Sequence, residues 1–471
     1  MIILLKSDHS AEISVSIVIH RQAKSKPDAR KGADFTVIRT AEKFYSRSYI
    51  INTDNVRLQP LFQEGHMNEN FKNFKAVKPE HKKNAPRTAE LFARRNAQDV
   101  ISFHRSFPGY EPTPLVSLPA LASELGIRSL NVKDESFRFG LNAFKVLGGS
   151  WCLARCIAEK LGWDPSELTF QRLTAPETLR KIDGTTFITA TDGNHGRGIA
   201  WTAAKLKQRC VVYMPHGSAA ERAENIRKTG AEVTVTDVNY DASVAMARDD
   251  AAKNGWTLVQ VTSCPGYEKI PSWIMQGYST LIYETAEQLD APPTHVFLQA
   301  GVGSMAGAAA ACLAQIYGAQ RPITVIVEPN KADCLFRTAE AGDGKLHSVG
   351  GALNSIMAGL SCGIPCSLAW ELLESLGDIF VSMPDYAAAQ GMRILGSPLP
   401  GDRRIISGES GASTAGLLTE TLRRPELKWL KEQLQLDENS RVLCISTEGA
   451  TDRANYRRIV WDGAWAAPEK E

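Results

Sequence analysis

From about residue 100 onward, short apolar runs rich in β-branched residues alternate with stretches of helical periodicity. Runs that are apolar throughout, instead of alternating with polar residues, indicate strands buried on both faces of a parallel sheet. Repeats of strand and helix then predict sheets covered by helices on both sides. The expected strands are Ser129–Val132, Thr186–Ala190, Cys210–Met214, Glu232–Thr236, Thr257–Val261, His295–Gln299, Ile323–Val327 and Val442–Ile445, and expected helices include Gly198–Leu206, Ala219–Thr229, Ala242–Lys253 and Ser304–Tyr317.

There are too many of these units, in a chain of 471 residues, for one small domain. The sequence therefore predicts the α/β class, with two doubly wound parallel-sheet domains and a ligand in the cleft between them, because such sheets bind ligands at the carboxyl ends of their strands. We assign residues 66–145 and 263–471 to a large domain and residues 146–262 to a small α/β domain. Residues 1–65 lack this patterning, and we expect them to form a poorly ordered extension.

The composition excludes several classes of function. With a formal net charge of +2, the chain shows no excess of basic residues that would indicate binding to nucleic acid. No apolar stretch approaches the roughly 20 residues that a membrane span requires. The nine cysteines show no spacing typical of a metal site, so we expect reduced thiols, no bound metal and a cytoplasmic location.

Lys145 stands in the segment ESFRFGLNAFKVLGGS (135–150), beside an apolar helical stripe. Its own face continues through the small residues Gly148, Gly149 and Cys152, so another backbone or a flat ring could approach closely. One interpretation is a lysine that extends its amine to solvent beside a tight helix contact. The other is a partly desolvated amine that forms a Schiff base.

Two glycine-rich loops each follow an expected strand and lead into a helix. TDGNHGRG (191–198) could present backbone N–H groups to a carboxylate or phosphate, although Asp192 and His195 could equally be helix-capping residues. AGVGSMAG (300–307) forms a compact phosphate cradle. Because Glu328 ends the next strand, where a Rossmann fold binds the ribose, this second loop could accept a phosphate monoester or a dinucleotide.

Taken together, these segments resemble the fold type II pyridoxal-phosphate enzymes of the tryptophan synthase β-subunit superfamily, and within it the diaminopropionate ammonia-lyase family. The resemblance extends from about Asn68 to Ala467. The motifs that carry it are PTPL (112–115), VKDESFRFGLNAFKVLGG (132–149), TDGNHGRG (191–198), GYEKIPSWIMQGY (266–278), QAGVGSMAG (299–307), VEPNKADC (327–334), IMAGLSCG (356–363), RIISGESGA (404–412) and STEGATD (446–452).

The resemblance implies that pyridoxal 5'-phosphate binds covalently to Lys145, with the small residues after Lys145 leaving room for it. Asn194 would hydrogen-bond the phenolic oxygen of the cofactor, and Ser446 or Thr447 would face its pyridine nitrogen. The implied phosphate-binding residues are Gly301, Val302, Gly303, Ser304 and Met305, and the implied substrate-binding residues are Thr191, Asp192, Gly193 and His195.

The implied reaction is α,β-elimination of 2,3-diaminopropionate to pyruvate and ammonia, with Asp192 as the base and Lys145 as an acid or base near the leaving group. The family has a second aspartate just before the GY-x-KIP segment, where this chain has Val261. We therefore expect a preference for the D-isomer. The alternative is a β-replacement synthase, or a lyase for another β-substituted amino acid. We expect a homodimer that acts on a small amino acid and binds neither nucleic acid nor membrane.

Overall fold

The computed structural model describes residues 49–51, 58–60, 73–80, 87–191 and 193–466. The chain divides into two compact units, residues 1–66 and residues 67–471. In the first unit, strand β1 (Tyr49–Ile51) pairs antiparallel with β2 (Leu58–Pro60). The rest of the predicted extension lies outside the described residues. All further elements belong to the second unit.

The larger sheet of the second unit has seven strands in the order β3-β12-β11-β10-β13-β5-β4. Its five central strands are parallel, with His295 opposite both Ile323 and Val442. The two short edge strands β3 and β4 are antiparallel to their neighbours, and the five parallel strands between them form the doubly wound sheet that the sequence predicts. The strands are β3 (Lys75–Val77), β4 (Leu115–Ser117), β5 (Ser129–Asp134), β10 (His295–Gln299), β11 (Ile323–Pro329), β12 (Ile379–Met383) and β13 (Arg441–Ser446).

The smaller sheet has four parallel strands in the order β8-β7-β6-β9. Its strands are β6 (Thr186–Ala190), β7 (Arg209–Met214), β8 (Glu232–Val235) and β9 (Thr257–Leu258). The two sheets divide the chain much as the predicted domains do, although the domain boundaries themselves remain a prediction.

Each sheet has one point where the direction of winding reverses. In the larger sheet β10, β11 and β12 lie in sequence order on one side, and β13 and β5 lie on the other. In the smaller sheet the reversal falls between β6 and β9. Loops at the carboxyl ends of strands diverge at such points, which opens a crevice for a ligand. The loops after β10 and β13 and the loop after β6 are therefore the expected parts of a site.

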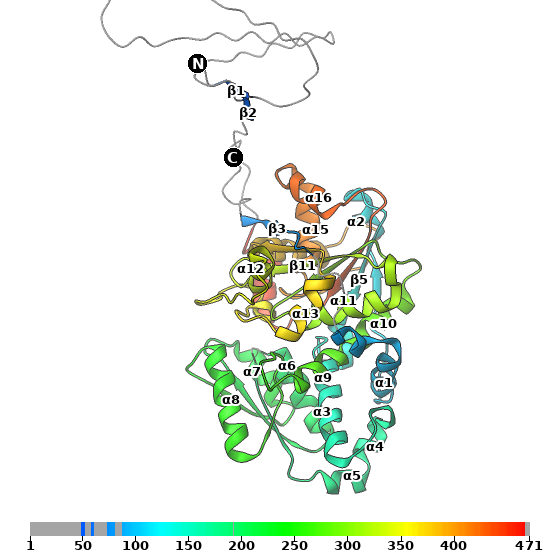
Figure 1. Cartoon of the computed structure of the whole chain (residues 1–471), viewed down its shortest axis with the longest axis vertical. Coiled ribbons are helices and arrows are strands. Elements are labelled where there is room, and N and C mark those ends of the chain that lie inside the picture. Colours follow the sequence, from blue (N-terminus) through cyan, green and yellow to red (C-terminus); the bar gives the residue numbers. More distant parts are fainter. Residues whose placement is uncertain (1–48, 52–57, 61–72, 81–86, 192, 467–471) are drawn as a thin grey trace, which may run out of the picture. The chain divides into compact units, whose positions relative to one another are not determined.

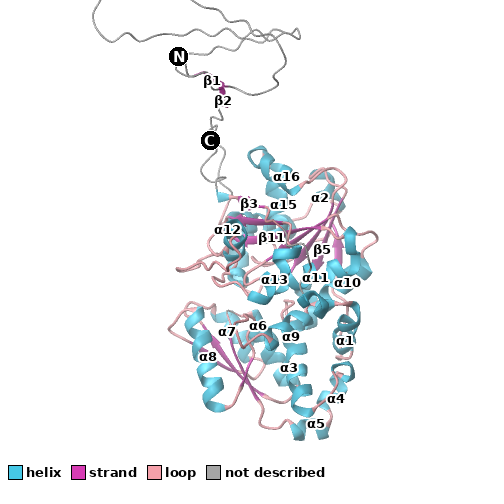
Figure 2. Ribbon diagram, in the orientation of Figure 1, coloured by secondary structure: helices cyan, strands magenta, loops and turns pink. Residues whose placement is uncertain are grey.

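Helices cover both faces of the sheets, as Figures 1 and 2 show. The α-helices are α1 (Arg94–Arg105), α2 (Pro119–Glu124), α3 (Val146–Leu161), α4 (Phe170–Thr174), α5 (Pro176–Lys181), α6 (Asn194–Lys205), α7 (Ala220–Arg227), α8 (Tyr240–Asn254), α9 (Lys269–Gly277), α10 (Ser279–Gln288), α11 (Ser304–Tyr317), α12 (Cys334–Ala341), α13 (Ser367–Leu376), α14 (Asp385–Gly396), α15 (Ser413–Arg423), α16 (Lys428–Leu434) and α17 (Arg453–Val460). Short 3-10 helices are η2 (Arg87–Phe92), η3 (Glu135–Gly140), η4 (Pro165–Glu167), η5 (Gly318–Gln320), η6 (Ala358–Leu360) and η7 (Pro425–Leu427).

Strand β10 shows why its sequence is apolar throughout. Val296 and Leu298 belong to the core that includes α11, whereas Phe297 between them belongs to the opposite core with α14 and α15. Successive side chains of a strand point to opposite faces, so a strand between two helical layers needs apolar residues at every position. The same pattern holds in β6, where Phe187 and Ile188 enter different cores.

All eight expected strands and all four expected helices occur, within a few residues of their predicted bounds. Strands β1, β2, β3, β4 and β12 were not predicted. The edge strands β3 and β4 have three residues each and no apolar run, whereas β12 is a buried strand whose run IFVSM fits the same pattern as the predicted strands.

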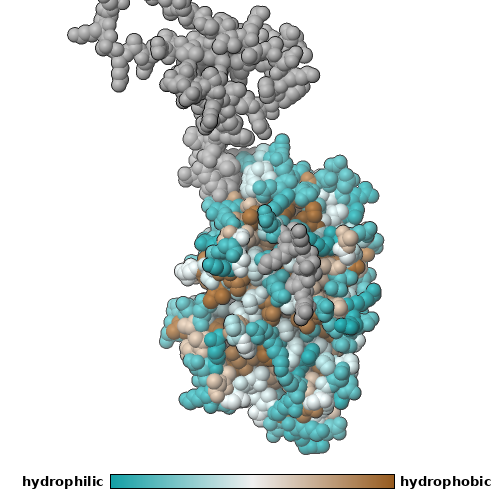
Figure 3. Space-filling view, in the orientation of Figure 1, coloured by the Kyte–Doolittle hydropathy of each residue, from teal (hydrophilic) through white to brown (hydrophobic). Residues whose placement is uncertain are grey.

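Figure 3 shows hydrophilic side chains distributed over the visible face of the described residues, with apolar ones scattered between them. Among the described residues, no helix has the length and apolar character needed to cross a membrane.

Candidate active site

A cavity of about 560 Å³ lies where the loops of the two sheets meet. Its wall includes Lys145 at the start of α3, loop residues after β6, β10 and β13, and part of the segment between α12 and α13. Predicted site residues that line it are Lys145, Thr191, Asn194, His195, Gly301, Val302, Gly303, Ser304, Met305 and Thr447. The fold thus brings together residues that are up to about 300 positions apart in sequence.

The backbone at Lys145 is fixed by the contacts of the two residues that precede it. The backbone N–H of Phe144 donates to the carbonyl of Thr447 at 3.1 Å, and Ala143 forms an isolated β-bridge with Glu448. Lys145 itself has helical dihedral angles at the N-cap of α3. Lys145 lines the cavity, and the segment that carries it is fixed to the loop after β13.

A buried ionic cluster stabilises the segment that precedes Lys145. Arg138, in η3, donates to both Glu135 and Glu284, and Lys133 donates to Glu284 at 3.0 Å. The four side chains are at most 1% exposed. Burial alone would raise the pKa of Glu284, but its hydrogen bonds and the charge of Arg138 hold that pKa at about 2. The cluster ties η3 and β5 to α10.

The small residues after Lys145 serve a different purpose from the one expected. A Cβ on Gly148 would lie 2.6 Å from the ring of Tyr278, and one on Gly277 would lie 2.6 Å from the Cα of Gly148. Neither Gly148 nor Gly149 lines the cavity. The expectation that they leave room for the cofactor is therefore wrong, because helices α6 and α9 fill that space. The other sequence-based possibility, a close approach of backbone, is correct.

The loop after β6 folds around the hydroxyl of Thr191, which accepts from the backbone N–H groups of Gly193 and Gly196 at 3.0 and 3.2 Å. His195 is buried, and its Nε2–H donates to the carbonyl of Val259 at 3.0 Å. This bond ties the start of α6 to the end of β9. Gly193 is not part of the cavity wall, and Asp192 lies outside the described residues.

The loop after β10 contributes five consecutive residues, Gly301 to Met305, to the cavity wall. Gly303 has φ +96, a backbone conformation that favours glycine, and it precedes the 14-residue helix α11. Backbone N–H groups at the start of a helix favour a bound anion such as phosphate. The loop therefore has the backbone geometry that a phosphate cradle needs, and phosphate binding there remains a prediction.

The two hydroxyl candidates after β13 lie in different places. Ser446 is fully buried, donates to the hydroxyl of Ser407 at 2.8 Å and is not part of the cavity wall. Thr447 lines the cavity, and its Oγ1 accepts from the amide of Gln299 at 3.0 Å. Because that oxygen accepts from Gln299, its own hydrogen is available to donate to a group in the cavity.

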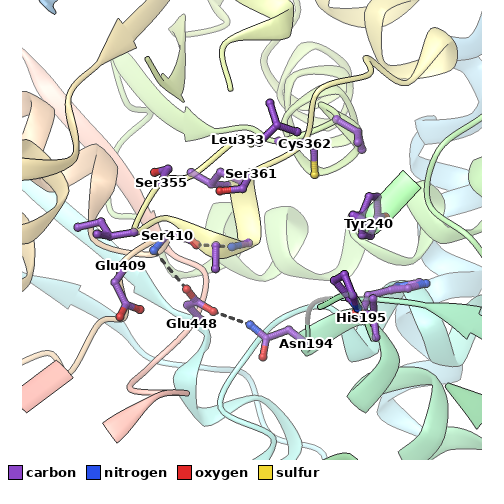
Figure 4. Close-up of a pocket in the computed structure, with 18 of the residues that line it drawn as sticks. Asn194, His195, Tyr240, Leu353, Ser355, Ser361, Cys362, Glu409, Ser410 and Glu448 are labelled. Atoms are coloured by element: carbon purple, nitrogen blue, oxygen red, sulfur yellow. Dashed lines mark hydrogen bonds between the residues drawn. The ribbon is translucent and has the colours of Figure 1, made fainter. Parts of the chain in front are cut away.

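Two glutamates in the cavity wall were not identified from the sequence. Glu448 accepts from Asn194 at 2.5 Å and from the N–H of Ser410 at 3.2 Å (Figure 4). Glu409 accepts from Asn455 at 2.5 Å. Burial, followed by the charge of Glu448, raises the pKa of Glu409 to about 7. Both lie in quoted motifs, SGESGA and STEGATD, but a glutamate after glycine or threonine carries no signal of its own.

Val261 lines the cavity beyond the end of β9, and its carbonyl accepts from Ser304 at 3.3 Å. The position where the family pattern has a carboxylate thus presents an apolar side chain to the site. Among the described residues, no cluster of histidine, cysteine and acidic side chains could hold a metal ion.

Glu328 does not face the cavity, so it cannot bind the ribose of a dinucleotide there. It is fully buried, and its two carboxylate oxygens accept from the N–H groups of Leu335 and Phe336 at 2.9 and 2.6 Å. The carboxylate therefore binds the first turn of α12 and does not face the cavity.

Comparison with known proteins adds three findings. Residues 106–448 match the family described as pyridoxal-phosphate dependent enzymes. Diaminopropionate ammonia-lyase of Escherichia coli strain K12 is 48% identical over 384 residues, which are 80% of this chain and 94% of that protein. The diaminopropionate ammonia-lyase of Salmonella typhimurium strain LT2 is 48% identical over 370 residues, 78% of this chain and 92% of that protein.

Solved structures agree with these matches. The holo form of the E. coli diaminopropionate ammonia-lyase has a TM-score of 0.79 and 44% identity, covering 84% of this chain and 98% of that one. The same enzyme in complex with D-serine has a TM-score of 0.79 and 45% identity, with the same coverage. Threonine deaminase isoform 2 of Solanum lycopersicum, at 17% identity and a TM-score of 0.62, covering 82% of this chain and 91% of that one, shares the fold.

Proposed function

The chain belongs to the pyridoxal-phosphate-dependent enzymes of fold type II and, among them, to the diaminopropionate ammonia-lyases, and we propose that it eliminates ammonia from D-2,3-diaminopropionate. Membership makes it a lyase that uses pyridoxal phosphate. The products are pyruvate and two molecules of ammonia. The observation that carries the proposal is the convergence of Lys145, the Gly301–Met305 loop and Thr447 on one cavity.

The cavity fits pyridoxal phosphate. The start of α11 supplies backbone donors for the phosphate, and Lys145 supplies an amine for the aldehyde. The hydrogen of Thr447 can donate to an unprotonated pyridine nitrogen, because Gln299 already donates to its oxygen. Asn194 can donate to the phenolic oxygen. When bound, the cofactor supplies the electron sink that elimination at the α and β carbons requires.

The residues of the chain supply binding and proton transfer. Thr447 is a neutral hydroxyl, so it does not hold a proton on the pyridine nitrogen as an aspartate does, and this favours elimination over transamination. The N–H groups of Asn194 and His195, at the start of α6, would bind the substrate carboxylate. Those of Thr191 and Gly193 already donate to Tyr213 and to Thr191. Lys145 donates or accepts protons beside the leaving group. Asp192 removes the α-proton from one face of the substrate.

The stereochemical preference follows from the pair of positions Asp192 and Val261. The two enantiomers, bound through the same carboxylate and amine, present the α-hydrogen to opposite faces. Val261 is in the cavity wall and cannot accept a proton. The D-isomer is the one that the family pattern associates with Asp192. The apolar side chain at Val261 is also the one observation that favours the alternative, a β-replacement synthase or a lyase for another β-substituted amino acid.

The proposal also covers the oligomeric state of the enzyme and its location in the cell. None of the nine cysteines forms a disulfide bond, which is typical of proteins of the reducing cytoplasm. Phe137 and Trp461 are 61% and 80% exposed, and large exposed apolar side chains are often covered by a second subunit. We expect a cytoplasmic homodimer, and light scattering of the purified protein measures its mass.

The function is tested by incubating purified protein and pyridoxal phosphate with both isomers of 2,3-diaminopropionate and serine and with other β-substituted amino acids. Pyruvate and ammonia are measured. Release of both from D-2,3-diaminopropionate, at a higher kcat/KM than from any other compound, supports the proposal. Turnover only in the presence of an added nucleophile, with no pyruvate formed, supports the β-replacement alternative.

A further inference from the structure

Glu448 connects two parts of the cavity wall that belong to different sheets. It follows β13 of the larger sheet, and its side chain lies between Ser410 and Asn194 (Figure 4). Ser410 precedes α15, whereas Asn194 is the first residue of α6, after β6 of the smaller sheet. The hydrogen bond between Glu448 and Asn194 thus links the two halves of the site.

Glu448 is the fixed member of this pair. The N–H of Gly408 donates to its carbonyl at 2.9 Å, and its Oε1 accepts from the N–H of Ser410 at 3.2 Å. The residue is 2% exposed, and its backbone also bridges to Ala143, two positions before Lys145. Several contacts with the backbone therefore hold the Glu448 carboxylate in place independently of Asn194.

The chemistry of the contact determines the orientation of the Asn194 amide. An ionised carboxylate only accepts hydrogen bonds, so the amide must turn its nitrogen, and not its oxygen, toward Glu448. The nitrogen carries two hydrogens, and Glu448 takes one of them. The second hydrogen remains for an acceptor in the cavity, and the charge of the carboxylate strengthens the bond that holds the amide in place.

We infer that Glu448 is a positioning residue, which orients the amide of Asn194 so that its second N–H donates to the phenolic oxygen of pyridoxal phosphate. This inference rests on the proposed function, since it requires that the cofactor occupies the cavity. Through this hydrogen bond Glu448 thereby affects the affinity for the cofactor, in the way that outer hydrogen bonds orient the ligands of a metal.

The test measures the dissociation constant of pyridoxal phosphate, by titration of the apoprotein, and the position of the visible absorption band. Glu448→Gln retains the size of the side chain but allows the Asn194 amide to turn over, and Glu448→Asp retains the charge but withdraws it from Asn194. We expect each to weaken cofactor binding about tenfold or more. The unfolding temperature of each apoprotein shows whether the variant is folded.

A double-mutant cycle shows whether Glu448 acts through Asn194. In an Asn194→Ala background, Glu448→Gln should have no further effect on the dissociation constant. Glu409→Gln is the matched control, because Glu409 lines the same cavity but accepts from Asn455. The factors by which Glu409→Gln and Asn194→Ala each change the dissociation constant should simply multiply in the double variant, which means that the two changes act independently.

Exchanging the amide and the carboxylate between positions 194 and 448 shows whether Glu448 acts by orienting the Asn194 amide or only by linking the two sides of the cavity. In the double variant Asn194→Asp and Glu448→Gln, the glutamine donates to the aspartate and restores the bridge, but residue 194 no longer carries an N–H. We expect the unfolding temperature of the apoprotein to recover while cofactor affinity remains low.

Recovery of affinity together with the bridge overturns the inference, as does independence of Glu448→Gln and Asn194→Ala in the cycle. Failure of the unmodified protein to take up pyridoxal phosphate is a different result, because it defeats the proposed function as well.

Discussion

A Cβ on Gly198 of helix α6 would lie 2.8 Å from the Cα of Val146, the first residue of helix α3. The backbone of α6 therefore packs directly against the residue that follows Lys145. No side chain at position 198 can be accommodated unless one of the two helices moves. Lys145 directly precedes α3, and Asn194 is the first residue of α6. The contact between the two helices therefore sets the distance between Lys145 and Asn194 across the cavity.

Gly198→Ala should reduce stability by about 1–3 kcal/mol, even though alanine favours a helix more than glycine, because the methyl group overlaps backbone. It should also weaken cofactor binding, since α3 is displaced. Urea unfolding and cofactor titration measure the two effects. Gly350→Ala is the control, because Gly350 is exposed and a Cβ there meets nothing within 4 Å. Unchanged stability of Gly198→Ala would show that the helices pack less tightly.

Lys145→Ala should abolish covalent attachment of the cofactor, because the cavity then lacks the amine that reacts with the aldehyde. The checks are the visible absorption band and, after borohydride reduction, the mass of the protein. Lys160→Ala, on the exposed end of the same helix, should retain both signals. A reduced adduct in folded Lys145→Ala protein would assign the cofactor to another lysine.

The unmodified enzyme should favour D-2,3-diaminopropionate over the L-isomer by a factor on the order of 100 or more in kcat/KM, the usual cost of losing a positioned base. Val261→Asp should raise kcat/KM for the L-isomer, and Val261→Asn, of the same size without a base, should not. Equal kcat/KM for the two isomers in the unmodified enzyme is the result that contradicts this prediction.

Glu409 should make stability depend on pH near neutrality. Burial and the charge of Glu448 raise its pKa from 4.5 to about 7, so the folded protein holds this proton more tightly than the unfolded chain. The resulting stabilisation is complete below pH 4.5 and is lost as the pH rises through 7. Chemical unfolding of the apoprotein at pH 5 and pH 8 should show a larger decrease for the unmodified protein than for Glu409→Gln. Parallel pH profiles would mean that Glu409 ionises normally.

Glu284→Gln should destabilise the protein by about 3–5 kcal/mol, because it leaves Arg138 and Lys133 buried without full compensation. Glu287→Gln lies on the same helix, but its partner Arg105 is exposed, so its effect should stay below about 1 kcal/mol. Since the pKa of Glu284 is held at about 2, the stabilisation in the unmodified protein should be lost as the pH falls from 4.5 toward 2. Similar losses in both variants would argue against a strong buried cluster.

The sequence by itself determined most of the buried strands and the two glycine-rich loops of the site. Buried strands such as β6 and β10 need apolar residues at every position, and this pattern is local enough to be recognised. Likewise, the glycines of 300–307 mark a turn into a helix wherever it occurs. Local patterns left two interpretations of Lys145 open, and the roles of Lys145, Asn194 and Thr447 were expected from the resemblance to the family; the three residues line one cavity.

Only the tertiary structure decided what the other residues do. Glu448 and Asn194 are 254 positions apart, and the function of that glutamate exists only because two sheets place it beside an amide. Gly148 and Glu328 were assigned to possible ligands, but helix α9 lies against the first and the N-terminus of α12 binds the second. A local pattern specifies which conformation a segment adopts, whereas the partner of a small or charged side chain depends on which distant segment packs against it.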